Sequence, residues 1–191
     1  MTVRVVLASG SPRRHELLAQ LGMEIDVRPS DIDETPLPGE HPIDYVRRLA
    51  LGKAEAAAFA AEPDTVVVAA DTTVEIDGQI LAKPDDAAHA VSMLQALRGR
   101  THHAHTGVAV RRGEHIKSVV VTTAVDFADV SDAEIAWYVG TGEPFDKAGA
   151  YAVQGRAAAY VRAVHGSVTN VVGLPLTETL ELLKQVGVVL R

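Results

Sequence analysis

The stretch that decides the fold is Val3-Arg4-Val5-Val6-Leu7-Ala8-Ser9-Gly10-Ser11-Pro12-Arg13-Arg14. Residues 3–8 form a β-branched, apolar run, as expected of a buried strand. Ser9-Gly10 interrupts the run, and Ser11 suits the N-cap of a helix. Pro12 suits the first helical position, because an N–H there would have no intrahelical partner. The stretch therefore predicts a strand, a tight turn and a helix, which Gly22 would end in a left-handed conformation.

Strand and helix patterns alternate irregularly along the rest of the chain. Asp77-Gly78 predicts a tight hairpin turn, and Gly113 predicts a second turn between two long strands. The remaining expected strands are around Ile25 and Val27 and over 65–70 (ending at Asp71), 101–111, 116–127 and 157–164. The expected helices are 43–61, 87–97, one opened by the capping-box pattern at Ser131, and one beginning at Pro175. Because two hairpins interrupt the alternation, we expect an α/β fold with a mixed sheet flanked by helices.

Composition narrows the classes of protein to which the chain can belong. The 191 residues suit one globular domain or one domain of two lobes. Apolar runs are far shorter than a membrane span, no signal-peptide pattern develops before Ser9, and the lack of cysteine excludes disulfides and thiolate zinc sites. We therefore expect a cytoplasmic protein with no membrane contact. A net charge of −7 and 4% aromatic residues argue against nucleic-acid binding, but not against a small phosphorylated substrate.

The first candidate site is the turn from Ser9 to Arg14. Backbone N–H groups at a helix start attract anions, and the two hydroxyls and two guanidiniums add donors suited to phosphate. The alternative is an ordinary capped helix with two solvated arginines, because the turn lacks the glycine spacing of a P-loop.

The second candidate is Asp71-Thr72, with Lys83 twelve residues beyond the aspartate. An acid at the end of a buried strand could hold Mg²⁺ or orient a water molecule, and Lys83 could neutralise a phosphate. The alternative is a turn acid paired with a surface lysine.

A third candidate is the glycine-rich segment 142–155, in which Gln154 offers both a donor and an acceptor for a base edge. Its alternative is an ordinary loop. The loop acids Asp31, Asp33 and Glu34 could bind a metal and Lys53 a phosphate, although an acidic loop is more often merely solvated. His102, His103 and His105 lack further ligands at zinc spacing and are interpreted as structural.

These segments together resemble the Maf family of nucleoside triphosphate pyrophosphatases, also labelled septum-formation inhibitors. The matching pieces follow the family's order and cover nearly the whole chain. They are residues 7–14 with Glu16-Leu17-Leu18, Asp33-Glu34, Arg48-Leu49-Ala50, Lys53-Ala54, Ala70-Asp71-Thr72, Lys83-Pro84, Thr106-Gly107-Val108, Glu143-Pro144, 146–151, Gln154-Gly155, Gly166-Ser167 and 171–176.

The resemblance implies a single Maf-like domain over residues 1–191, with an elongated, ITPase-like mixed sheet, two lobes and a central cleft. It implies a hydrolase acting on phosphoric anhydrides, a divalent cation (Mg²⁺ or Mn²⁺) and, often in the family, a homodimer. Residues at the matching positions resemble the branch that acts on dTTP and UTP, with modified pyrimidine nucleotides, a house-cleaning role and a link to division arrest as extensions.

The resemblance also implies roles for individual residues. Asp71 would assist the attacking water and, with Glu34, hold the metal. Three residues would choose the base, and five would line the phosphate and metal region. The base set is Arg13, Thr72 and Gln154, and the phosphate and metal set is Ser9, Arg14, Glu34, Lys53 and Lys83.

Two positions depart from the family pattern. Ala152 stands where glycine is usual, which removes the freedom for positive φ, and Thr73 stands where a branched aliphatic residue is commoner. Both bear on base preference more than on the reaction. The competing hypothesis is a non-catalytic nucleotide-binding regulator of septum formation, which would need the phosphate site but no catalytic acid.

Overall fold

The computed structural model describes residues 4–59, 62 and 64–189. The strands are β1 (Arg4–Leu7), β2 (Glu24–Val27), β3 (Val66–Ile76), β4 (Gln79–Leu81), β5 (Thr101–Arg112), β6 (His115–Phe127) and β7 (Val161–His165). The helices are α1 (Pro12–Ala19), α2 (Pro42–Phe59), α3 (Ala87–Leu97), α4 (Asp132–Gly140), α5 (Val168–Val172) and α6 (Leu176–Gln185). Three short 3₁₀ helices are η1 (Glu143–Asp146), η2 (Ala148–Ala150) and η3 (Arg156–Tyr160).

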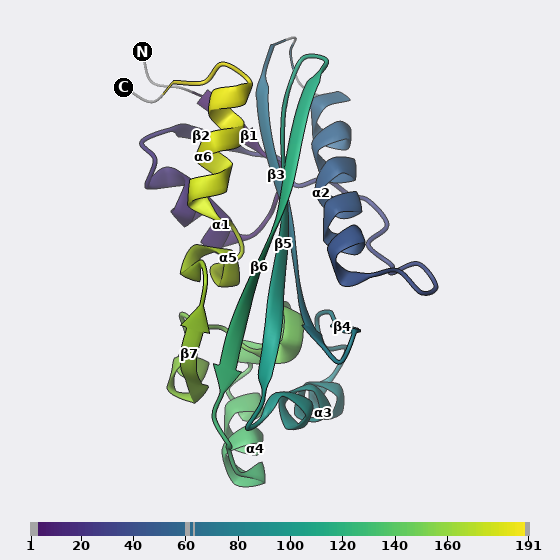
Figure 1. Ribbon diagram of the computed structural model, residues 1–191, viewed down its shortest axis with the longest axis vertical. Helices are drawn as coiled ribbons and strands as arrows, with labels where there is room; N and C mark the ends of the chain where they lie inside the picture. The colour runs from purple at the N-terminus through teal and green to yellow at the C-terminus, as the bar shows by residue number, and fades with distance from the viewer. Residues whose placement is uncertain (1–3, 60–61, 63, 190–191) are drawn as a thin grey trace. The chain divides into compact units, whose positions relative to one another are not determined.

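The strands form one seven-stranded sheet in the order β2-β1-β3-β5-β6-β7, with β4 paired to β3 (Figure 1). β1 runs parallel to both β2 and β3, whereas β3 with β4 and β6 with β7 are antiparallel. The expected mixed α/β sheet is therefore confirmed. In the described part of the chain, none of the helices has the length and apolarity needed to cross a membrane.

The chain divides into two compact units. Unit 1 comprises residues 1–71, 106–121 and 173–191, and unit 2 comprises 72–105 and 122–172. β3, β5 and β6 contribute residues to both units.

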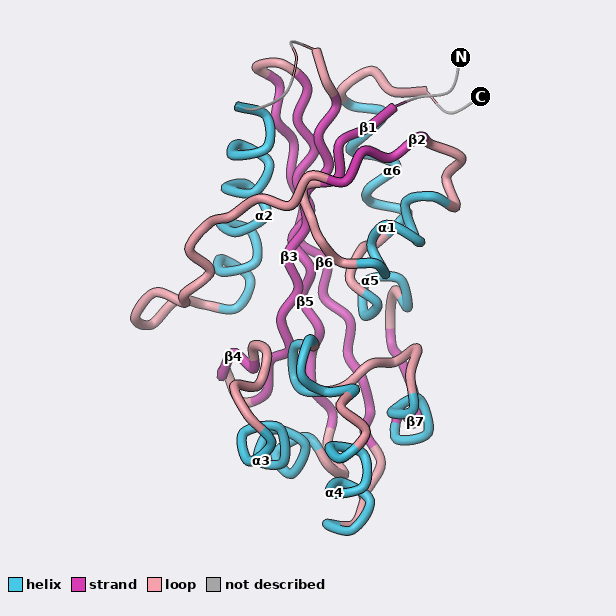
Figure 2. The backbone as a smooth tube through the Cα atoms, turned by 180° about the vertical axis from the view of Figure 1, so that it is seen from behind, coloured by secondary structure: helices cyan, strands magenta, loops and turns pink. Residues whose placement is uncertain are grey.

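In unit 1, α2 covers one side of the strands while α1 and α6 lie on the other (Figures 1 and 2). The face of α2 that carries Ala50, Ala54 and Ala57 packs against small and branched side chains of β1, β3 and β5. Gly107 of β5 brings its backbone against this helix, since a Cβ atom there would lie 2.3 Å from the Val46 carbonyl oxygen. Small residues on both surfaces thus set α2 close to the sheet.

The core of unit 2 is built from α3, α4 and an aromatic group. Phe127 packs edge-on against Tyr151 and Tyr160, and Tyr138 packs edge-on against Tyr160. The Ser131 capping box that opens α4 is present, as predicted. The hairpin turn is confirmed too, with Asp77 and Gly78 at φ 54° and 77°.

Several details of the prediction are wrong. The strand expected to end at Asp71 instead runs without a break into the first arm of the predicted hairpin, Val74 to Ile76, so β3 extends to Ile76. Residues 157–160 belong to η3 instead of a strand, which suits the low β-propensity of three consecutive alanines. Ser11 occupies the N-cap of α1 and Pro12 the first helical position, as predicted, although the side chain of Ser11 makes no capping bond. α5 was not predicted, and Val3 and residues 60–61, expected in a strand and a helix, lie outside the described residues.

Candidate functional site

A buried lysine between two carboxylates forms the centre of the candidate site in unit 1. Lys53 of α2 donates from Nζ to Asp71 Oδ1 of β3 at 2.6 Å and pairs with Glu34 Oε1 at 2.7 Å. The side chains of Lys53 and Asp71 are 8% and 9% exposed, whereas Glu34 is 45% exposed. The group therefore has a buried end at Asp71 and a solvent-facing end at Glu34.

Burial dominates the electrostatics of Asp71. It raises the pKa of the carboxyl group above the usual aspartate range, although the charges of Lys53 and Arg14 act in the opposite direction. Burial likewise lowers the pKa of Arg14, and the charge of Asp71 is the strongest influence against that shift. Asp71 thus keeps an enhanced affinity for a proton while two cations lie nearby.

Arg14 is fixed by contacts at the start of α1. Its Nη1 donates to Ser9 Oγ at 3.1 Å and its Nε to the Gly173 carbonyl at 2.9 Å. Ser9 Oγ also accepts from the Ser11 backbone N–H at 3.2 Å. The hydroxyl of Ser9 therefore links the turn after β1 to Arg14, and the guanidinium is held in place before any ligand arrives. Arg13 lies beside it, half-buried in the first turn of α1.

The loop that carries Glu34 is tied to α2. Tyr45 donates its hydroxyl to the Glu34 carbonyl at 3.0 Å, and Arg48 binds Glu40 through two nitrogens at 2.6 and 2.7 Å. Burial, followed by the charges of Asp71 and Glu34, raises the pKa of Tyr45. Of the three loop acids considered from the sequence, Glu34 is the one that pairs with Lys53.

Tyr45 was missed by the sequence analysis. Its spacing from Leu49 and Lys53, four and eight residues along a helix, would have placed all three on one broad face.

The donor set fits a divalent cation. Asp71 and Glu34 converge on one ammonium group, so their oxygens already surround a positive charge. Mg²⁺ is commonly held by one or two carboxylates together with substrate phosphates. Among the described residues, no group of three or more histidine, cysteine, aspartate or glutamate side chains is arranged to hold a metal. A cation at this site would therefore have two carboxylates as its protein ligands and would need substrate phosphates as further ligands.

Thr72, Lys83 and Gln154 belong to unit 2. Thr72 follows Asp71 in β3, where successive side chains leave opposite faces of the strand. Lys83 is exposed just after β4, and the preceding Ala82 carbonyl accepts from the Gly149 N–H at 3.2 Å. Gln154 is exposed between η2 and η3. The structure thus joins Glu34, Lys53 and Asp71 directly, and Ser9 with Arg14, and it places these other three residues in unit 2.

The two departures from the family pattern sit without backbone strain. The positive φ angles next to Ala152 are those of Gly149 and Ala150, at 67° and 59°, and Ala152 has none. Thr73 is buried in β3. The loop therefore does not use the freedom that a glycine at position 152 would give.

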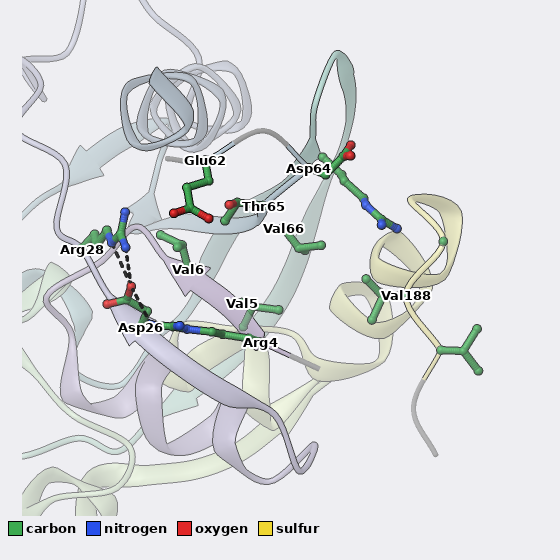
Figure 3. Close-up of a pocket in the computed structure, with 13 residues that line it drawn as sticks. Arg4, Val5, Val6, Asp26, Arg28, Glu62, Asp64, Thr65, Val66 and Val188 are labelled. Atoms are coloured by element: carbon green, nitrogen blue, oxygen red, sulfur yellow. Dashed lines mark hydrogen bonds and ion pairs between the residues drawn. The ribbon is translucent and has the colours of Figure 1, made fainter. Parts of the chain in front are cut away.

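A separate pocket of about 700 Å³ opens in unit 1 near the N-terminal ends of β1 and β3 (Figure 3). Val5, Val6 and Val66 line it, together with Arg28, which binds Asp26 at 2.6 and 2.9 Å. Its described lining includes none of the predicted site residues. Ser9 follows the carboxyl end of β1, where ligands of open α/β sheets usually bind, and Asp71 lies in the middle of β3.

The chain is similar to one protein family and to several known proteins. The family model described as "Maf-like protein" matches residues 4–186. A dTTP/UTP pyrophosphatase of Anaeromyxobacter dehalogenans is 57% identical over 98% of this chain and 96% of its own length. A dTTP/UTP pyrophosphatase of Myxococcus xanthus is 52% identical over 96% of this chain and 92% of its own. A solved HAM1 protein from Coxiella burnetii aligns over 68% of this chain and 75% of its own, with a TM-score of 0.49 and 18% identity.

Proposed function

The chain belongs to the Maf family, and we propose that it hydrolyses nucleoside triphosphates to the monophosphate and pyrophosphate, with dTTP and UTP as substrates. The observation that carries this proposal is the buried carboxylate of Asp71, held 2.6 Å from Lys53 and influenced by the charge of Arg14. Relatives that are 52% and 57% identical bear the name dTTP/UTP pyrophosphatase, which supports the choice of substrates. Modified pyrimidine triphosphates are included as further substrates.

Asp71 acts as the general base. It accepts a proton from a water molecule whose oxygen forms a bond to the α-phosphorus, while the bond from that phosphorus to the pyrophosphate oxygen breaks. The raised pKa suits this task, because the carboxylate then takes up a proton more readily than an exposed aspartate would. Lys53 keeps Asp71 oriented and adds positive charge beside the phosphates.

Glu34 and Asp71 are the proposed holders of Mg²⁺ or Mn²⁺. Such an ion supplies charge neutralisation at the phosphates when it is bound. Ser9, Arg14 and Lys83 are proposed to bind phosphate oxygens. Hydroxyl, guanidinium and ammonium groups all suit such contacts.

Arg13, Thr72 and Gln154 are proposed to select the base. Gln154 is suited to that role because an amide can donate and accept at once on a pyrimidine edge. We also propose that residues 1–191 form one Maf-like domain, with units 1 and 2 as its lobes. We further propose that the protein acts in the cytoplasm and that it forms a homodimer, as members of the family often do.

The test is pyrophosphate release by the purified protein with Mg²⁺ or Mn²⁺, across the common triphosphates. We expect release from dTTP and UTP, and a loss of about 10²- to 10⁴-fold in kcat for Asp71→Asn with nucleotide binding retained. Asp44→Asn is the matched control, because Asp44 is an exposed member of an i,i+3 pair on α2. A fully active Asp71→Asn enzyme would remove Asp71 from the chemistry. Nucleotide binding without turnover of any substrate would instead favour a regulator of septum formation.

A further inference from the structure

Gln154 stands on a tight turn of unit 2. The Gly155 N–H donates to the Ala152 carbonyl at 3.1 Å, so Val153 and Gln154 occupy the two central positions. Three residues further along, the Ala158 N–H donates to the Gly155 carbonyl at 3.1 Å, within the first turn of η3. The position of the exposed Gln154 side chain therefore depends on how the backbone of this short segment is held.

Glu143 anchors the far side of this turn. Its Oε2 accepts from the Arg156 backbone N–H at 3.1 Å, and the nearby backbone of Ala157 also acts to lower the pKa of the carboxyl group. Its own carbonyl accepts from Lys147 Nζ at 2.7 Å, which fixes the residue from behind. Although burial raises the pKa of Glu143, these hydrogen bonds hold it below the usual range, so the anchor stays charged at neutral pH.

Tyr138 connects Glu143 to the near side of the turn. This fully buried side chain of α4 donates its hydroxyl to Glu143 Oε1 at 2.9 Å. The backbone of Ala152 lies near the same hydroxyl and acts to lower its pKa. The carboxylate of Glu143 thus holds the backbone directly after the turn, and its partner Tyr138 lies beside the backbone before the turn.

Gly155 shows how closely the carboxylate approaches the turn. A Cβ atom on this glycine would lie 2.1 Å from Glu143 Oε1. The backbone angles of Gly155, φ −110° and ψ −155°, lie in the extended region that other residues adopt. Glycine is therefore required at position 155 because of the neighbouring carboxylate, and not because of its conformation.

We propose that Glu143 is a positioning residue for base selection: its carboxylate holds the Ala152–Gly155 turn so that Gln154 presents its amide in one orientation. The proposal rests on the proposed function in one respect, the assignment of Gln154 to the base. The anchoring of the turn by Glu143 is inferred from the contacts alone.

The test combines hydrogen exchange with kinetics on the full chain. In Glu143→Gln and Glu143→Ala, we expect amide exchange in residues 153–157 to accelerate at least tenfold. We also expect the preference for UTP over CTP in kcat/KM to fall by a similar factor, mainly through KM. Glu134→Gln is the matched control, because its carboxylate also accepts a backbone N–H in unit 2, that of Ser131 at 2.7 Å, but lies outside the turn.

A double-mutant cycle sharpens the test. Gly155→Ala should disturb exchange and selectivity strongly in the wild-type background and much less in Glu143→Ala, where the colliding carboxylate is absent. Additive effects would contradict the proposed contact.

The outcomes separate this inference from the function on which it rests. Unchanged exchange in both Glu143 variants overturns the anchoring. Faster exchange with an unchanged base profile, while Gln154→Ala does alter that profile, overturns the link to selection. If Gln154→Ala itself leaves the profile unchanged, the assignment of Gln154 fails, and with it the role of Glu143 in selectivity.

Discussion

Each unit contains a carboxylate that is partly or fully buried: Asp71 beside Lys53 and Glu34 in unit 1, and Glu143 beside the Ala152–Gly155 turn in unit 2. The surroundings of the two acids shift their pKa values in opposite directions. Asp71 faces side-chain cations, burial outweighs them, and its pKa is raised. Glu143 accepts from backbone groups and a phenol, which outweigh burial, and its pKa is lowered. The difference separates an acid suited to exchanging a proton from one suited to holding a chain segment.

The largest effect on stability should come from replacing Lys53, which pairs with Asp71 and Glu34 in unit 1. Lys53→Met leaves Asp71 and Glu34 without their shared cation, and removing one partner of a buried pair costs about 3–5 kcal/mol. We expect the free energy of unfolding, measured in urea at neutral pH without metal, to fall by that amount. Added Mn²⁺ should restore more stability to this variant than to the wild type, because the two carboxylates are then open to it.

The control for that experiment is Lys184→Met, a substitution of the same kind in the last turn of α6. Equal responses of the two lysine variants to Mn²⁺ would contradict the assignment of Glu34 and Asp71 as metal ligands.

An effect of intermediate size is expected in the pH dependence of stability, from a histidine near the Ala152–Gly155 turn of unit 2. His102 is buried, Tyr151 next to the turn meets its Nε2 at 2.7 Å, and burial lowers the pKa of His102 to about 4. The unfolded chain takes up this proton near pH 6.5, so the stabilising contribution is complete above pH 6.5 and is lost as pH falls toward 4. The loss is about 3 kcal/mol over that window.

Urea unfolding between pH 7 and 4.5 would measure this slope. His102→Gln should flatten it, whereas His165→Gln, at an exposed histidine paired with Asp126, should leave it nearly unchanged. A wild-type slope that survives His102→Gln would show that another group is responsible.

The smallest effect distinguishes two helix starts. Ser131 caps α4 through a full capping box, whereas the side chain of Ser11 does not cap α1. Ser131→Ala should therefore lower the free energy of unfolding by about 1 kcal/mol. Ser11→Ala should change it by less than about 0.5 kcal/mol. Equal losses would mean that Ser11 does cap α1 in solution.

Much of the fold followed from local pattern. The β1–α1 unit, the Asp77-Gly78 hairpin and the Ser131 box are short-range signals whose chemistry acts within a few residues, and all three are present. The end of β3 was wrong because the strand runs unbroken into the Asp77-Gly78 hairpin. The state of 157–160 was wrong because the start of η3 is held by Glu143, which is distant in the sequence.

The candidate site was predictable only in part. Acids, lysines and arginines could be named from their types and from the family resemblance. The sequence could not reveal that Glu34, and neither Asp31 nor Asp33, pairs with Lys53, because that depends on how Tyr45 and Arg48 tether the loop. Glu143 was noticed as part of a motif but not as an anchor, since its partners include a backbone N–H, a group that every residue except proline carries.

Gly107 carries a consequence for how substitutions in this chain would be sorted. Any side chain there would displace the backbone of α2 at Val46, two turns before Lys53. In a library selected only for turnover, position 107 would tolerate as few replacements as position 71, although glycine has no group that could join the reaction. Ranking positions by tolerance alone would therefore not distinguish a glycine that sets the position of α2 from the proposed catalytic acid, Asp71.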